Sequence, residues 1–273
     1  MPNILPSLAD SDAAQSPKTN LIELLGFMAR SSVARLTEGQ GWTRWWTPLP
    51  HPWFSGIRVA RAADADADRL IGDSIAYFQR QDASAFTWWL DPEVAVQPWA
   101  KALTAHGFSY EADTPGMAAE MAALPAETPT PRDFRIAPVS DSETLRLWAG
   151  VFIAGYGLPA AWAASLFHLL DGLPQGAPLL NYLGYLGDAP VTASSLFLGE
   201  HVAGIYNVAT LPQARRQGLG AAMTLAPLRD AQAEGYRVAV LQSSSLGYRV
   251  YEGLGFRRTC AADCFIWSSR TAR

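Results

Sequence analysis

The sequence predicts a mixed α/β protein with two tandem domains of one plan, each a mostly antiparallel mixed sheet flanked by helices. The chain has 273 residues, enough for two domains of ordinary size. Hydrophobic residues make up 49% and charged residues 17%, so each half can bury a core. The segment LPAETPTPRDF (124–134) is rich in proline and typical of an extended connector. We therefore expect a flexible tail at 1–17, a first domain at 18–124, a linker at 125–133 and a second domain at 134–273.

The C-terminal half shows strand and helix patterns in an order that favours a mixed sheet. A short strand leads into two helices, the first beginning after Ser140 or Asp141 and the second ending at Gly172. An antiparallel meander follows and continues into a strand–loop–helix–strand unit, which places helices on both faces of the sheet. The predicted strands are 134–137, 181–186, 189–198, 201–210, 238–242 and 265–267, and the predicted helices are 141–154, 160–170, 219–234 and 247–252.

The N-terminal half repeats part of this order. In LTAHGFSY (103–110) and YEGLGFRR (251–258) a short helix ends at Gly-Phe and a strand follows, which indicates two copies of one fold. The predicted strands are 57–61, 86–90 and 117–121, and the predicted helices are 65–81 and 98–105.

Composition excludes several classes of function. A net charge of −4 gives no overall basic surface for nucleic acid. No apolar run reaches the ~18 residues of a membrane span, and the N-terminus lacks a signal-peptide pattern, so we expect a cytoplasmic protein without membrane contact. Cys260 and Cys264 are too few for a disulfide framework or a metal site, and we expect reduced thiols and no metal.

The stretch ARRQGLGAAM (214–223) has the features of an anion site at the start of a helix. Unpaired amides of a first helical turn carry partial positive charge, and glycines let a ligand approach the backbone. Arg215 and Arg216 add forked donors that suit phosphate oxygens. Ala221 and Ala222 follow where a Walker loop needs Lys-Ser/Thr, and the preceding meander strand does not suit a Rossmann site.

Together with its surroundings, this loop resembles the GNAT family of acyl-CoA N-acyltransferases. The resemblance covers about 134–267 and depends on Arg-x-x-Gly-x-Gly at 215–220, on HVAGIYNVATLP before it and on SSSLGYRVYEGLGF after it. It implies acetyl-CoA as cosubstrate and transfer of acetyl to a primary amine of a small molecule, by direct attack in a ternary complex. The loop amides would hold the CoA pyrophosphate, and the strand at 208–210, splayed from 238–242, would bond the pantetheine arm. Ser244 stands where the family often has Asn. The implied cofactor-binding residues are Val208, Ala209, Thr210, Arg215, Arg216, Gln217, Gly218, Leu219, Gly220, Ala221 and Ser244.

By the same resemblance, Tyr251 is the catalytic residue. A phenol can hydrogen-bond the departing CoA thiolate, and can protonate it if the phenol's own pKa is lowered somewhat. The competing interpretation is an aromatic packing residue. No acid lies between His201 and Thr210, so we expect a water relay with backbone help, or an acceptor that arrives neutral. His201 and Tyr206 are candidates for the base, beside a structural role for each.

The first half carries opposite charges where the second half has its phosphate loop. Asp64, Asp66 and Asp68 would repel a pyrophosphate, and Leu103 stands in the place of Tyr251. We hypothesise a degenerate GNAT-like domain that has lost the CoA loop and serves as scaffold or as a wall of the acceptor pocket. One acyl-CoA per chain follows.

The acceptor and the class of protein stay open at this point. The segments 141–170 and 170–178 are expected to wall the acceptor, and their few acids favour an apolar or amino-acid-like amine over a polycation. The Trp-rich stretch 41–54 is either a binding surface or core and inter-domain packing. The alternative function is a non-catalytic acyl-CoA sensor or partner-binding protein, and a third is a structural dimer piece. A homodimer is compatible with each. The expected aromatic side chains of the acceptor wall are Trp148, Phe152, Tyr156, Trp162 and Phe167.

Overall fold

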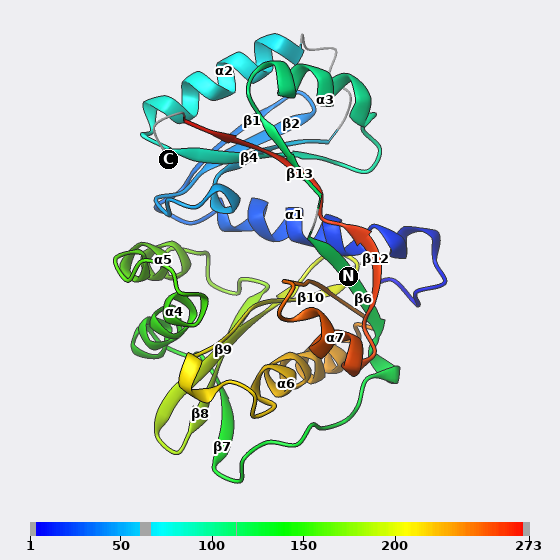
Figure 1. Ribbon diagram of the computed structural model, residues 1–273, viewed down its shortest axis with the longest axis vertical. Helices are drawn as coiled ribbons and strands as arrows, with labels where there is room; N and C mark the ends of the chain where they lie inside the picture. Colours follow the sequence, from blue (N-terminus) through cyan, green and yellow to red (C-terminus); the bar gives the residue numbers. More distant parts are fainter. Residues whose placement is uncertain (1–3, 61–66, 113, 270–273) are drawn as a thin grey trace.

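The computed structural model describes residues 4–60, 67–112 and 114–269, which form two sheets placed end to end along the longest axis (Figure 1). Helix α1 (Ser16–Met28) lies between the two sheets. The predicted fold class, two mixed and mostly antiparallel sheets flanked by helices, is confirmed.

The larger sheet has seven strands in the order β12-β6-β11-β10-β9-β8-β7. All neighbours are antiparallel except β10 and β11, which run parallel. Helices α4 and α5 cover one face and α6 the other, so apolar cores lie on both sides. The strands are β6 (Pro115–Glu120), β7 (Phe134–Pro138), β8 (Leu179–Leu186), β9 (Ala189–Leu198), β10 (Ala203–Thr210), β11 (Val238–Gln242) and β12 (Arg257–Ala261), and the helices are α4 (Ser142–Tyr156), α5 (Trp162–Asp171), α6 (Leu219–Ala233) and α7 (Tyr248–Leu254).

The smaller sheet has six strands in the order β1-β2-β3-β4-β13-β5. Its core is aromatic: Phe86 stacks on Phe78 with 4.0 Å between ring centroids. The strands are β1 (Arg35–Gly39), β2 (Trp42–Trp46), β3 (Gly56–Val59), β4 (Ala85–Leu90), β5 (Ser109–Glu111) and β13 (Cys264–Ser268), and the helices are α2 (Ala67–Arg80) and α3 (Val96–Ala105).

The two sheets exchange strands, which the sequence did not predict. We expected 117–121 in the first sheet and 265–267 in the second. Instead β6 pairs with β11 and β12 in the larger sheet, and β13 pairs with β4 and β5 in the smaller one. The linker at 125–133 therefore does not separate the sheets, although it contains neither helix nor strand. Both strands are buried and apolar, and such strands do not encode their partner.

The expectation of a flexible tail at 1–17 is wrong for its described part. Leu5 and Ala13 are buried, and the Leu5 amide donates to the His201 carbonyl at 2.9 Å. A short 3-10 helix, η1 (Ser11–Ala14), leads into α1, which begins at Ser16. The segment packs because its apolar side chains bury themselves against Ala118 of β6 and Val238 and Val240 of β11 in the larger sheet.

Most other predicted elements are confirmed within a few residues, and both ends of α4 show local signals of the kind that made this possible. Asp141 caps α4: its carboxylate accepts the Thr144 amide at 2.7 Å. Gly157 ends the same helix with a φ of 68°. The elements that the sequence did not predict are α1, β1, β2, β5 and β12.

Candidate active site

The phosphate-loop candidate joins β10 to α6. A 3-10 turn, η4 (Pro212–Ala214), follows the strand, and the backbone then passes through Arg216 and Gly218 with φ of 64° and 80°. Gly218 caps α6 without a side-chain bond, so the first-turn amides of the helix have no side-chain cap. The predicted candidates Gln217, Leu219, Gly220 and Ala221 all lie in this turn. The geometry suits an anion at the start of α6.

The two glycines of the loop have different structural roles. A Cβ on Gly218 would lie 2.3 Å from the Pro129 carbonyl oxygen, so the linker passes directly over this residue. A Cβ on Gly220 would meet nothing nearer than Val208 Cγ1 at 4.0 Å. Gly218 is therefore fixed by its φ and by the linker, whereas Gly220 leaves open space beside β10.

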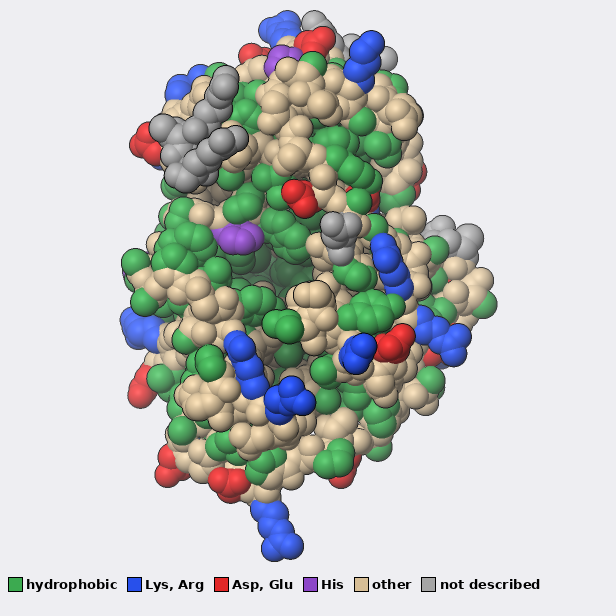
Figure 2. All heavy atoms as spheres, in the orientation of Figure 1, with side chains coloured by type: hydrophobic (Ala, Val, Ile, Leu, Met, Phe, Trp, Pro, Cys, Tyr) green, Lys and Arg blue, Asp and Glu red, His purple; other side chains and the backbone are tan. Residues whose placement is uncertain are grey.

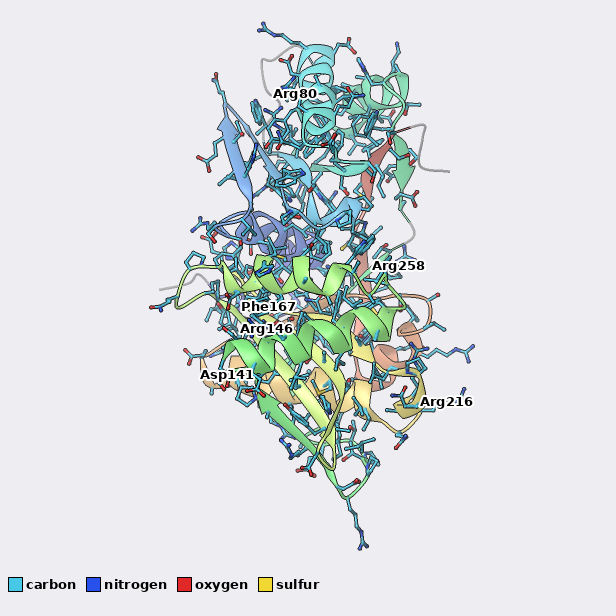
Figure 3. The ribbon with its side chains drawn as sticks, turned by 90° about the vertical axis from the view of Figure 1, so that its left-hand side faces the viewer. Arg80, Asp141, Arg146, Phe167, Arg216 and Arg258 are labelled. Atoms are coloured by element: carbon cyan, nitrogen blue, oxygen red, sulfur yellow. The ribbon has the colours of Figure 1, made fainter. Side chains whose placement is uncertain are left out.

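The two arginines of the loop also differ. Arg215 Nη2 donates to the Gly155 carbonyl at 2.7 Å and Nε donates to the Thr210 carbonyl at 3.1 Å. Arg215 thus joins the end of α4 to the end of β10, and its role as a phosphate ligand stays a prediction. Arg216 is exposed and directed away from the sheets (Figure 3), which leaves its guanidinium available to an incoming anion.

The predicted splay of β10 from β11 is present. The parallel ladder runs from Ala203↔Ala239 to Ile205↔Leu241 and stops there. The register of β10 against β9 shifts between Tyr206 and Ala209, and Asn207 has a φ of 57° at this bulge. Beyond Ile205, β10 pairs with β9 only, through Tyr206, Ala209 and Thr210. The side of β10 that faces β11 is therefore an open backbone edge, which includes the candidates Val208, Ala209 and Thr210.

A cavity of about 440 Å³ opens at this splay. Figure 2 shows a hollow lined by hydrophobic side chains between the two halves of the molecule. The chain segments that line it come from both halves, and Tyr251 and Val208 both contribute. The lining residues are Leu21, Leu24, Leu25, Met28, His51, Trp53, Phe54, Phe152, Tyr156, Leu158, Ile205, Tyr206, Asn207, Val208, Gln242 and Tyr251.

Tyr251 lies in α7, and the Gly255 turn with φ of 106° ends this helix. Burial, and secondarily the nearby Tyr156 phenol, raises the pKa of Tyr251 above its usual range. The lowered pKa that full proton transfer would require is therefore absent, because burial disfavours the phenolate. The Tyr251 O–H can still donate a hydrogen bond to a departing thiolate.

Neither predicted base candidate suits that role. Tyr206 is buried, its hydroxyl donates to Asn20 Oδ1 at 2.7 Å, and burial raises its pKa well above the usual value. His201 precedes β10 at the end opposite the loop and outside the cavity lining. Among the described lining residues no carboxylate is present.

The sequence did not single out His51, which lines the cavity from the N-terminal half. It caps the 3-10 helix η2 (Pro52–Phe54), where its Nδ1 accepts the Trp53 amide at 3.3 Å. Its ring packs edge-on against Phe54 and Trp162. Burial lowers the pKa of His51, so the ring is neutral at pH 7. Its place in the Trp-rich stretch 41–54 was the available signal.

The expected acceptor wall is present only in part. Phe152 and Tyr156 of α4 line the cavity, whereas Trp148 is buried and donates to the Ser194 carbonyl at 2.9 Å. Phe167 lies under the Arg146 guanidinium, 4.2 Å from the ring centroid, in the contact between α4 and α5 (Figure 3). Trp162 supports His51. None of the described residues of 170–178 lines the cavity.

Ser244 begins the turn that leads into α7. Its Oγ accepts the Gly247 amide at 3.2 Å, and its carbonyl accepts the Tyr248 amide at 3.1 Å. The side chain is exposed. Ser244 therefore orients the helix that carries Tyr251, and its contact with pantetheine stays a prediction.

In the N-terminal half, all four residues of the corresponding strand β3 pair with β4. The parallel ladder runs from Gly56↔Thr87 to Val59↔Leu90. Arg58 of β3 forms an ion pair with Asp91, which follows β4, and 2.7 Å separates Arg58 Nη2 from Asp91 Oδ2. Leu103 is fully buried, so no phenol stands in the place of Tyr251. Of the predicted acidic run, Asp64 and Asp66 lie outside the described residues, and Asp68 contacts His106 at 3.0 Å.

The described residues lack two further features. They contain no cluster of three or more His, Cys, Asp or Glu side chains that could hold a metal ion. They also contain no helix that is long and apolar enough to span a membrane.

Comparisons with known proteins show a matching family model over part of the C-terminal half and a shared fold. Residues 200–259 match the family model for the acetyltransferase (GNAT) domain, so the resemblance of the C-terminal half is confirmed. A comparison with curated protein sequences finds no match.

Solved structures share the fold over almost the whole chain. A GCN5-related N-acetyltransferase from Kribbella flavida is similar with a TM-score of 0.67 at 18% identity, covering 92% of this chain and 95% of that one. One from Sphaerobacter thermophilus has a TM-score of 0.59 at 14% identity, covering 85% and 81%. A tandem GNAT protein from the clavulanic acid biosynthesis pathway has a TM-score of 0.57 at 13% identity, covering 93% and 96%. The chain thus shares the tandem GNAT fold of these structures.

Proposed function

We propose that the protein is an N-acetyltransferase that transfers acetyl from acetyl-CoA to a primary amine of a small molecule. One observation carries the proposal: the splayed strand and Tyr251 line the same cavity, and the same strand leads through η4 into the start of α6. The anion loop suits the CoA pyrophosphate, the open edge of β10 suits the pantetheine amides, and the cavity leaves room for an acceptor.

The chemistry follows from this arrangement. The neutral amine attacks the thioester carbonyl, the C–N bond forms, and the C–S bond breaks to release the CoA thiolate. The Tyr251 O–H donates a hydrogen bond to the sulfur as negative charge develops there. Because the described cavity lining holds no carboxylate, the amine proton leaves through water or the acceptor binds neutral.

Release of free thiol from acetyl-CoA tests the proposal, with amines, amino acids and antibiotics as acceptors. Amine-dependent thiol release with an acetylated product supports it, and its absence over the whole panel contradicts it.

Calorimetry supplies the second measurement, the number of acetyl-CoA molecules bound per chain. We expect one acetyl-CoA per chain, because all four residues of β3 pair with β4 in the first half and the buried Leu103 stands in the place of Tyr251. Two comparable sites would contradict this.

An acyl-CoA sensor without turnover is the second candidate. The lack of a carboxylate in the described lining favours it. A sensor would bind acetyl-CoA with the same stoichiometry but release no thiol with any amine. The two candidates also differ in how they respond to Tyr251→Phe, as discussed below.

A further inference from the structure

Part of the cavity wall comes from the N-terminal half of the chain, whereas Tyr251 belongs to the C-terminal half. Leu21, Leu25 and Met28 of α1 contribute apolar side chains, and Trp53 and Phe54 of η2 add aromatic ones. α1 is held in place by polar contacts to the larger sheet. Asn20 Nδ2 donates to the Val202 carbonyl at 3.1 Å, and Gln242 Nε2 donates to the Pro17 carbonyl at 2.6 Å. The wall is therefore a fixed part of the site.

The cavity has no charged group among its described lining residues. The side-chain amides of Asn207 and Gln242 already donate hydrogen bonds within the protein. Asn207 Nδ2 donates to Ser195 Oγ at 3.1 Å, and Gln242 Nε2 donates to the Pro17 carbonyl. A second ammonium or a carboxylate on the acceptor would lose its hydration here without a charged partner. Such burial of an unpaired charge is strongly unfavourable.

The imidazole of His51 is a polar group in the part of the cavity wall that the N-terminal half forms. Because Nδ1 accepts the Trp53 amide, the neutral ring carries its proton on Nε2. Nε2 has no hydrogen-bond partner within the described part of the chain. In this tautomer the ring presents an N–H donor and no basic lone pair, which suits recognition of a neutral oxygen on the acceptor.

We propose, on the basis of the proposed function, that the acceptor is a primary amine on an apolar and otherwise uncharged body. In this proposal the N-terminal half selects it: α1 and η2 hold the apolar body, and His51 Nε2–H donates to a neutral hydroxyl or carbonyl oxygen on it. His51 is a positioning residue for the acceptor. The C-terminal half then holds acetyl-CoA, and each half of the chain binds one substrate.

Four amines of equal length test the acceptor class on the unaltered protein: hexylamine, aminohexanol, diaminohexane and aminohexanoate. We expect kcat/KM for hexylamine and aminohexanol to exceed that for the two doubly charged amines by about tenfold or more. Faster acetylation of diaminohexane or aminohexanoate would overturn this inference while leaving the proposed function intact. No acetylation of any amine, in this series or in the wider panel, would instead contradict the proposed function.

Variants of His51 test the positioning role. His51→Phe should raise KM for aminohexanol about 5- to 20-fold more than it raises KM for hexylamine, so that the ratio of the two KM values changes. His51→Gln, whose amide can both accept from Trp53 and donate into the cavity, should restore much of the preference for aminohexanol. An equal loss for both amines would overturn the positioning role.

The cavity could instead take a long acyl chain, and the same assay detects this. Octanoyl-CoA would then outpace acetyl-CoA with ethylamine as acceptor. That result would overturn the assignment of the cavity to the acceptor. We expect acetyl-CoA to be the better donor, because the apolar body of the amine fills the space.

Discussion

At the scale of single residues, the Tyr251 phenol decides between enzyme and sensor. Its raised pKa keeps it protonated, so it acts by hydrogen bonding to the departing sulfur. We predict that Tyr251→Phe lowers kcat about 10- to 100-fold, with little change in acetyl-CoA affinity measured by calorimetry. Tyr248→Phe in the same helix is the control and should keep its activity. An unchanged kcat in the Tyr251 variant would contradict the role.

Gly218 and Gly220 give a second prediction. Gly218→Ala should destabilise the fold by about 1 to 3 kcal/mol and weaken acetyl-CoA binding, because Ala disfavours the φ of 80° and meets Pro129. Gly220→Ala should leave stability unchanged, since its Cβ enters open space. Urea unfolding and calorimetry measure both variants. Equal losses in the two would contradict the difference between them.

The buried ring of His51 makes stability depend on pH. Its pKa is lowered in the folded state, so protonation favours unfolding. The neutral His51 ring contributes its full share of the free energy of unfolding above the ordinary histidine pKa of about 6.5. This share is lost as pH falls below that value, because the unfolded chain binds the proton first. We predict that the free energy of unfolding drops less between about pH 8 and pH 5.5 in His51→Gln than in the unaltered protein. Parallel curves would show that another group is responsible.

At the scale of elements, α1 is the part that links the two halves at the site. Asn20 is buried and serves both the Tyr206 hydroxyl and the Val202 carbonyl. We predict that Asn20→Leu costs about 2 to 4 kcal/mol, because it leaves two buried groups without partners. Gly26→Ala, whose Cβ meets no atom within 4 Å, is the control in the same helix and should not destabilise. Urea unfolding of both variants tests this, and a cost below that of the control would contradict it.

Element boundaries were predictable where local chemistry sets them. The capping box at Asp141, the loop before α6 and the buried strand VAVLQ all carry short-range signals. The missed strands β1 and β12 are short and carry charged residues (RLTEG, RRTCA), so their pattern resembles that of loops. Short-range signals also predicted three parts of the site: the loop before α6, the splay of β10 and the position of Tyr251. The cavity wall depends on packing between distant segments, which no local pattern encodes.

At the scale of the whole molecule, the exchanged strands bind the halves into one unit. Asp263 lies between β12 and β13, where the chain crosses from one sheet to the other, and accepts from Lys18 Nζ at 2.8 Å and from the Tyr110 hydroxyl at 3.0 Å. We predict one cooperative unfolding transition. Tryptophan fluorescence, far-UV circular dichroism and loss of acetyl-CoA binding should coincide in urea. Two separated transitions would contradict it.

The exchange itself could not be predicted from the sequence. FTWWL in β4 and the alanine-rich β6 are apolar on both faces, so alternation gives no preferred partner. Because the two domains have similar topologies, a strand can take an equivalent position in either sheet. Only the total of tertiary contacts, including the Asp263 bonds at the crossing, decides between them.

The strand exchange also sets an order for synthesis on the ribosome. β5 pairs only with β13, and β6 pairs only with β11 and β12. Strands made in the first half of translation must therefore wait, unpaired, until the end of the second half has emerged. The smaller sheet receives β13, which lies between β4 and the edge strand β5, last of all described strands, and only then does β5 gain a partner. A nascent chain stalled after the GNAT loop would leave the apolar strands β4 and β6 without their partners from the later part of the chain, which makes it a natural target for chaperones.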